Sequence, residues 1–128
     1  MKIVITENQY KRLIEAEEEP KILKFPSLGF FDEDREVAWN IIQKIVERKG
    51  NPLYSIEGNL DLSDTPIKSL GSLQSVGGYL DLGRTPIESL GDLQSVGGNL
   101  YLNDTPISKK YSEEEIRQMV NVGGKIYL

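Results

Sequence analysis

Two aspartates, Asp61 and Asp81, occupy the same place in two nearly identical stretches of the chain. Residues 58–77 and 78–97 are identical at fifteen of twenty positions. If the stretches lie side by side as neighbouring strands, the two carboxyl groups come within about 5 Å, the separation used by retaining glycosidases. Equivalent sites on one open face, however, offer no means of making one carboxyl an acid and the other a nucleophile. We therefore expect no catalytic residues and no enzymatic activity.

The same pair of carboxylates raises the question of a bound cation. Asp61 and Asp81, together with nearby asparagines, carry the oxygen ligands that calcium prefers. The repeats lack the dense Asp and Gly spacing of calcium-binding β-helices. We expect no cofactor and no metal site, and the sequence leaves open whether Asp61 and Asp81 bind a cation.

Composition removes several other chemistries. The 128 residues include no Cys and no His, and the net charge is −5. Thiol nucleophiles, disulfides and imidazole acid–base catalysis are therefore excluded. An acidic chain is poorly suited to neutralising phosphates, and no segment approaches the roughly 20 apolar residues of a membrane span. We expect a single-domain, cytoplasmic protein with no direct nucleic-acid or membrane partner.

The duplicated stretch extends in both directions. Its pattern is G-x-L-x-L-x-x-T-P-I-x-S-L-G-x-L-Q-S-V-G. A third copy begins at residue 98, is interrupted at 108–118, and closes with Met119 in the place of Leu93 and Val122 in the place of Val96. A fourth copy opens at Gly124, and a half copy begins at Leu53. The repeats thus cover residues 53–128.

Each copy encodes a short strand followed by a turn. Leu80 and Leu82 alternate with polar residues, which places both leucines on one face of a strand. The following Thr85-Pro86 ends the strand, because proline cannot donate to a ladder. The apolar residues after it recur every three positions, which predicts irregular or 3₁₀-like backbone there. Stacked copies would bury each other's apolar edges in one parallel sheet of about four strands.

The phrase L-x-L-x-x-T-x-I-x-x-L resembles the leucine-rich repeat. Thr65, Thr85 and Thr105 stand where that family usually has Asn, and we expect their hydroxyls to bond the backbone of the neighbouring coil. The resemblance implies an α/β solenoid with an N-terminal capping helix and a convex-side helix near the C-terminus. Short repeats with this phrase also resemble small proteins of tailed bacteriophages.

Residues 21–52 are expected to form the N-terminal cap. An amphipathic helix is predicted over 33–49, beginning at Asp32 or Asp34 and packing on the first coil. A second helix is predicted in the insertion at 108–118, because Ser112 and Glu115 form a capping box. Its apolar face is expected to consist of Ile116, Met119 and Val120.

Residues 1–20 are predicted to form a separate helical leader. It resembles the leaders that direct internal proteins into tailed-phage heads, where a protease cuts after Glu. The sequence Ile14-Glu15-Ala16-Glu17 fits that pattern loosely, and the alternative is a peripheral helix that covers the core edge. A new N-terminus near Glu18 in purified virions would support packaging.

The residues between and after the paired leucines are expected to line the concave face. Asp64, Arg84 and Asp104 alternate in charge and predict a structural ladder. Asp61 and Asp81 would repel each other, so Arg84, a cation or a basic partner must compensate. The expected partner-binding residues are Asn59, Asp61, Tyr79, Asp81, Arg84, Asn99, Tyr101, Asn103 and Tyr127.

A face rich in tyrosine and asparagine is typical of protein recognition. We expect a non-enzymatic protein-binding module, in one version a phage-encoded effector that inhibits a host protein in the host cytoplasm. The alternative is a structural or virion-packaged phage protein addressed by its leader. A homodimer through the edge strand 125–128 is also predicted.

Overall fold

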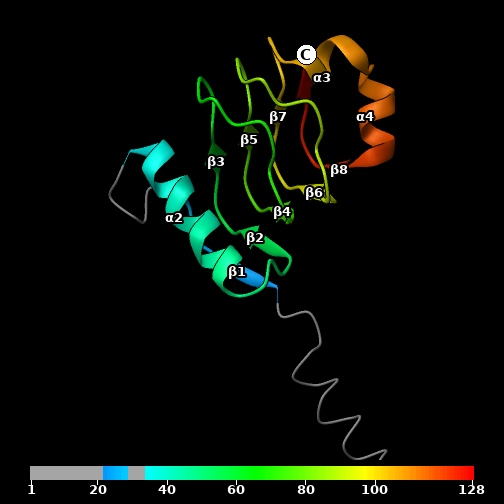
Figure 1. Ribbon diagram of the computed structural model, residues 1–128. Helices are drawn as coiled ribbons and strands as arrows, with labels where there is room; N and C mark the ends of the chain where they lie inside the picture. Colours follow the sequence, from blue (N-terminus) through cyan, green and yellow to red (C-terminus); the bar gives the residue numbers. More distant parts are fainter. Residues whose placement is uncertain (1–21, 29–33) are drawn as a thin grey trace, which may run out of the picture.

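The computed structural model describes residues 22–28 and 34–128, and it shows parallel sheets with a few helices (Figure 1). The expected α/β class is therefore confirmed. One sheet has the strand order β1 (Leu23–Phe25), β2 (Tyr54–Ile56), β4 (Leu73–Val76), β6 (Ser95–Val96) and β8 (Asn121–Val122). The other has the order β3 (Leu60–Asp61), β5 (Leu80–Asp81), β7 (Leu100–Tyr101) and β9 (Ile126–Tyr127). The helices are α2 (Arg35–Arg48), α3 (Pro106–Lys110) and α4 (Glu113–Met119).

The second sheet corrects the expectation of a single sheet with irregular backbone behind it. Residues such as Leu73–Val76 form strands, because the equivalent segments of successive copies lie in register. The amide of Gly97 donates to the carbonyl of Val76 at 2.8 Å, and Gly123 repeats this bond to Val96 at 2.8 Å. Apolar spacing alone did not distinguish this extended segment from a 3₁₀ turn.

Backbone hydrogen bonds join neighbouring copies in both sheets. In the four-stranded sheet, the Leu60 N–H donates to the Tyr79 carbonyl at 2.9 Å. In the five-stranded sheet, the Gly77 N–H donates to the Ile56 carbonyl at 2.8 Å. Each copy is therefore bonded to its neighbour through both sheets at once.

A single cluster of buried apolar side chains joins both sheets and α2. Leu80 and Leu82 have no exposed surface, and neither do their equivalents in the copies on either side. The paired leucines of the repeat therefore point into the core, as the alternation predicted. Their neighbours Tyr79 and Asp81 remain partly exposed on the opposite face.

The threonines act within their own copy, and the expectation of bonds to the neighbouring coil is wrong. The hydroxyls of Thr65, Thr85 and Thr105 donate to the carbonyls three residues earlier, at 2.6, 2.8 and 2.6 Å. The residue before each threonine has a positive φ, 57° at Arg84 for example. This left-handed residue reverses the chain sharply, so the hydroxyl reaches the carbonyl of the leucine that directly follows its own strand.

Helix α2 packs on the first copy, as expected, and Asp34 caps its N-terminus by accepting the Glu36 amide at 3.0 Å. Tyr54 is one residue that α2 contacts. Its buried hydroxyl donates to the Leu70 carbonyl at 2.6 Å and accepts from Gln43 Nε2 of α2 at 2.8 Å. Its ring also meets Trp39, with centroids 6.2 Å apart. One tyrosine thus connects the helix, the first copy and the core.

The insertion forms α3 and α4, which lie at the opposite end of the molecule from α2 (Figure 1). The capping box of Ser112 and Glu115 is present. Ile116 and Val120 are buried, but Met119 is 46% exposed, so its expected inward position is wrong. Ile116 and Val120 are four residues apart and therefore lie on the same, inward side of the helix. Met119 lies at the edge of that side and stays partly exposed.

The predicted helix in residues 1–20 lies outside the described residues, as does the region around Asp32. The division into leader, cap and repeats therefore stays a prediction. In the described residues, α2 begins at Arg35 rather than at residue 33.

Replacing Gly97 by alanine should destabilise the protein by about 1 to 3 kcal/mol. A Cβ atom at this position would overlap the carbonyl oxygen of Gly77, which is backbone and cannot turn aside. Urea unfolding measures the change, with Asp92→Ala, an exposed position in the same copy, as the control. Equal midpoints for the two variants would contradict the close approach of the copies.

Comparing Tyr54→Phe with the wild type at two pH values tests whether the buried Tyr54 hydroxyl contributes to stability. Burial raises the pKa of Tyr54 above its usual value. The unfolded chain therefore loses this proton above about pH 10 while the folded chain keeps it, so this contribution to stability is present below pH 10 and declines above it. We expect the free energy of unfolding of the wild type to exceed that of Tyr54→Phe by about 1 kcal/mol at pH 8 and by less at pH 11. A constant gap in urea unfolding at both pH values would show that the hydroxyl ionises equally in both states.

Candidate functional site

Three tyrosines form an aromatic row on the outer face of the four-stranded sheet, and we call the surface around them the tyrosine face. Tyr101 and Tyr127 are in register on β7 and β9, and their rings stack with centroids 4.8 Å apart and planes at 6°. The edge of Tyr79 meets Tyr101 at 6.1 Å and 88°. Strand alternation holds these rings outward because the intervening leucines are buried. The structure therefore brings together the three predicted tyrosines.

The two predicted aspartates are in register on β3 and β5 but have different surroundings. The guanidinium of Arg35, the first residue of α2, pairs with Asp61 at 2.9 Å and also donates to Ser63 Oγ at 3.0 Å. Arg35 supplies the compensating charge that the sequence required for Asp61. The repeat pattern does not single out Arg35, although a cation at the start of the helix predicted to cover the first copy is a usable signal.

Arg84, one of the three charges considered as compensation for Asp61 and Asp81, is bound to Asp64. Its Nε and Nη2 atoms donate to the two carboxylate oxygens at 2.6 and 2.7 Å. This hydrogen-bonded pair lowers the pKa of Asp64 and raises the pKa of Arg84. The bidentate pair confirms the predicted ladder between Asp64 and Arg84.

Asn59 and Asn99 take part in joining the copies. Asn59 Oδ1 accepts the Tyr79 amide at 2.9 Å, and Asn99 Oδ1 accepts the Lys125 amide at 2.8 Å. Asn99 also donates to the Tyr101 hydroxyl at 3.2 Å. The side chains of Asn59 and Asn99 therefore hydrogen-bond residues of the tyrosine face or of the strands that carry it.

Asp81 lies between the aromatic and the charged parts of the face. Its Oδ1 accepts the Gly83 amide at 2.9 Å, and within residues 22–28 and 34–128 no ion pair involves it. Burial, followed by the charges of Asp61 and Asp81, raises the pKa of the Tyr79 hydroxyl. Asp81 is therefore an unpaired carboxylate, among the described residues, beside the tyrosines.

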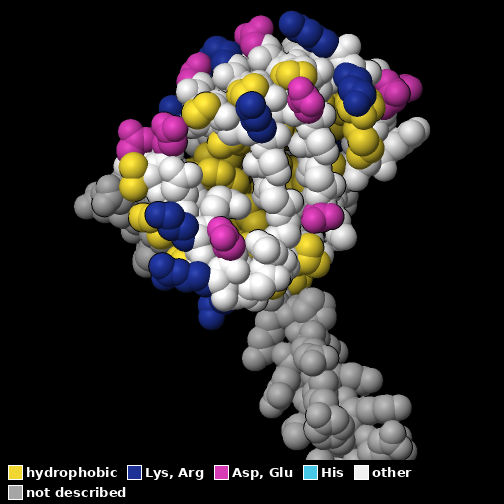
Figure 2. All heavy atoms as spheres, in the orientation of Figure 1, with side chains coloured by type: hydrophobic (Ala, Val, Ile, Leu, Met, Phe, Trp, Pro, Cys, Tyr) yellow, Lys and Arg dark blue, Asp and Glu magenta, His cyan; other side chains and the backbone are white. Residues whose placement is uncertain are grey.

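Charge elsewhere on the surface is mixed. Figure 2 shows acidic and basic side chains interspersed over the face it displays, with apolar side chains between them. Among the described residues no group of three or more Asp and Glu side chains is arranged to hold a metal ion. Nor is any helix in the described part of the chain long and apolar enough to cross a bilayer.

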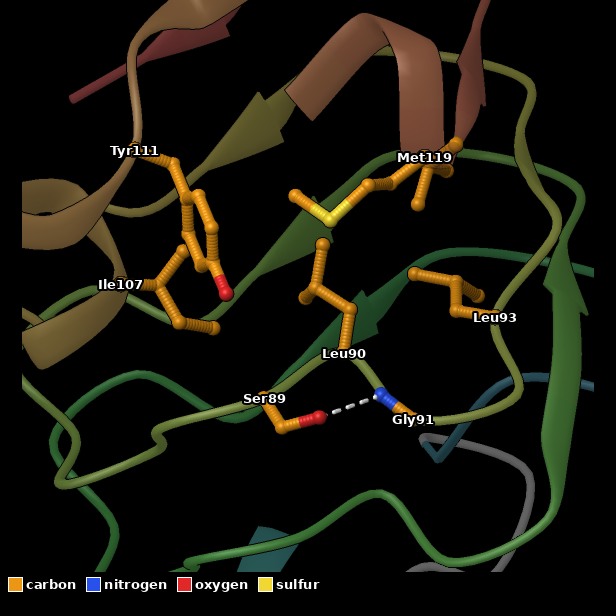
Figure 3. Close-up of a pocket in the computed structure, with 8 residues that line it drawn as sticks. Ser89, Leu90, Gly91, Leu93, Ile107, Tyr111 and Met119 are labelled. Atoms are coloured by element: carbon orange, nitrogen blue, oxygen red, sulfur yellow. Dashed lines mark hydrogen bonds between the residues drawn. The ribbon is translucent and has the colours of Figure 1, made fainter. Parts of the chain in front are cut away.

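A small apolar hollow of about 100 Å³ lies where the insertion meets the second copy (Figure 3). The side chains of Tyr111 and Met119 point toward each other over Leu90. Its volume is well below the roughly 300 Å³ at which small-molecule pockets begin. The hollow lies where α3 and α4 interrupt the third copy, and the sequence pattern does not predict it.

No protein-family model, no curated protein and no solved structure matches this chain.

Asn99→Ala should lower the free energy of unfolding by about 0.5 to 1.5 kcal/mol, because it removes the acceptor of the Lys125 amide. Asn103 makes no such bond to a following copy within the described residues, so Asn103→Ala should change stability by less than about 0.5 kcal/mol. Parallel urea unfolding compares the two. If Asn103→Ala costs as much as Asn99→Ala, the role assigned to the Asn99 side chain is wrong.

Proposed function

We propose that this protein is a non-enzymatic binding module of the leucine-rich-repeat type, a small solenoid that binds a protein partner through the tyrosine face. The observation that carries the proposal is the row of Tyr79, Tyr101 and Tyr127, which is held in contact on an open sheet face. Tyrosine is enriched where proteins bind each other, since it contributes a large contact area with few rotatable bonds.

The solenoid assignment is supported by the regular step between copies. Leu60 pairs with Leu80 and Leu80 with Leu100, so equivalent residues of consecutive copies are direct neighbours. The paired leucines face inward and the intervening positions face outward. This is the arrangement that the resemblance to leucine-rich repeats implies.

The tyrosine face is prepared for binding before a partner arrives. The stacked rings of Tyr101 and Tyr127 restrict each other's rotamers, and Asn99 hydrogen-bonds the Tyr101 hydroxyl. A partner therefore pays less conformational entropy to order these side chains than it would on a flexible loop. Tyr127 is 42% exposed, so a substantial aromatic area remains available for contact.

A catalytic role for the aspartates is disfavoured. Asp61 is bound by Arg35 and Ser63, and Asp81 lies on an open sheet surface. General acid–base catalysis needs groups placed around a substrate in a shaped site. A phage origin, action in the host cytoplasm and self-association through β9 remain further parts of this proposal.

Tyr101→Ala should weaken partner binding at least tenfold while changing the free energy of unfolding by no more than about 1 kcal/mol. Tyr101 is the middle ring of the row, so its removal separates Tyr79 from Tyr127. The wild-type chain is immobilised to capture partners from host lysate, and the affinity of each captured protein is then measured against the variants.

The matched control is Lys68→Glu, an exposed residue beside Gln43 of α2 and outside the tyrosine face. A captured protein that binds Tyr101→Ala normally but loses affinity for Lys68→Glu would show that another surface is used. Circular dichroism of each variant confirms that it is folded.

A further inference from the structure

The first copy of the repeat contains a complete arginine site. Arg35 Nη1 lies 2.9 Å from Asp61 Oδ1 and 3.0 Å from Ser63 Oγ. The Ser63 amide and hydroxyl also donate to Asp61 Oδ1, at 3.0 and 2.7 Å. A carboxylate held by the turn after the strand thus receives a guanidinium from a neighbouring element.

The second copy has the same carboxylate in the same turn. Asp81 is the register partner of Asp61, and the Gly83 amide donates to Asp81 Oδ1 at 2.9 Å, as Ser63 does in the first copy. Two parts of the first site have no counterpart here. Gly83 has no hydroxyl, and within the described residues no cation pairs with Asp81.

The Asn103 amide occupies the place of the side chain that Gly83 lacks. A Cβ atom at Gly83 would lie 2.9 Å from Asn103 Oδ1 and 3.1 Å from Asp81 Oδ1, so no free space remains above the buried Gly83 backbone. The Asp81 carboxylate and the Asn103 amide oxygen both lie close to this one point and are both hydrogen-bond acceptors. We call these two side chains the Asp81–Asn103 pair.

The nearest arginines of the chain are bound elsewhere. Arg35 begins α2 and is held at the first copy by Asp61. Arg84 follows Gly83 directly, but both oxygens of Asp64 hold its guanidinium. The second copy therefore repeats the acceptor of the first without a donor among these two side chains.

The surroundings of the Asp81–Asn103 pair favour a guanidinium over other cations. Tyr101 is the register partner of Asp81, and Tyr79 precedes Asp81 by two residues on the same face. Guanidinium groups stack on aromatic rings, and their planar set of donors can satisfy a carboxylate and an amide oxygen together. An ammonium group has neither property to the same degree.

We propose that the Asp81–Asn103 pair binds an arginine side chain of the partner, in the way that Asp61 and Ser63 bind Arg35. This inference rests on the proposed protein-binding function and specifies the chemistry of the partner. The partner segment presents an arginine to Asp81, with its neighbouring residues against Tyr101 and Tyr127. The net charge of −5 favours the approach of such a basic segment.

The test uses the ¹⁵N-labelled full chain and Nα-acetyl-arginine amide as the probe, and it needs no identified partner. Amide resonances of Gly83, Asp81 and Tyr101 should shift on titration and saturate, while the uncharged isostere Nα-acetyl-citrulline amide leaves them unchanged. Asp81→Asn keeps the shape of the side chain but loses a charge-assisted hydrogen bond. It should therefore lower the affinity for the probe at least fivefold.

Arg35→Gln supplies a second, independent measurement. Removing Arg35 frees the equivalent carboxylate, so a second set of shifts should appear at Asp61 and Ser63 on titration with the same probe. Absence of shifts at Gly83 in the wild type, equal shifts in Asp81→Asn, or equal affinity for Nα-acetyl-lysine amide would overturn the arginine assignment.

A captured partner separates this inference from the proposed function. If Tyr101→Ala weakens binding of that protein and Asp81→Asn does not, the tyrosine face is the binding surface and the arginine assignment fails. If neither variant affects it, the proposed function itself fails. Loss of affinity in both variants, with a matching loss on replacing one partner arginine by lysine, supports both.

Discussion

The close approach of backbone at the glycines between copies is the constraint on which the rest of the structure depends. A Cβ atom on Gly77, Gly97 or Gly123 would overlap a carbonyl oxygen of the preceding copy. Only glycine therefore lets the amides at these positions reach the preceding strand, at 2.8 Å in each case. Because the same copies are also hydrogen-bonded through the other sheet, their spacing is fixed on both sides.

This fixed spacing determines what the outer face can present. Neighbouring strands lie about 4.8 Å apart, which matches the stacking distance of aromatic rings, so Tyr101 and Tyr127 stack without distortion at 4.8 Å. The same spacing would oppose Asp61 and Asp81 as like charges. Helix α2 relieves that repulsion at the first copy through Arg35, and the cap is thus part of the electrostatics of the face as well as of the core.

Much of the fold followed from the sequence because its signals are local. The alternation at Leu80 and Leu82 determined the strands, and the Ser112–Glu115 capping box determined the start of α4. The second sheet was not predicted, since a three-residue apolar spacing suits both a tight turn and an extended segment. The threonine bonds were misassigned because they depend on a left-handed residue, and residue type gave no sign of that conformation at Arg84.

The site was predictable in its residues but only partly in its contacts. The three tyrosines could be placed on one face from the period of the repeat, whereas their stacking depends on rotamers that only the structure shows. The pairing of Arg35 with Asp61 joins residues 26 positions apart and depends on where α2 lies. Aligning the copies of the repeat does not predict this contact, because Arg35 belongs to no copy.

The insertion in the third copy has a consequence for how the protein can change over time. It lengthens the step between copies from 20 residues to 26, and it does so equally in both sheets, as the pairs Ser95–Asn121 and Leu100–Ile126 show. The added length is absorbed between β7 and β8, and the strands on either side keep their partners. The α3–α4 insertion can therefore change in length and sequence without altering the register of the strands that carry the tyrosine face.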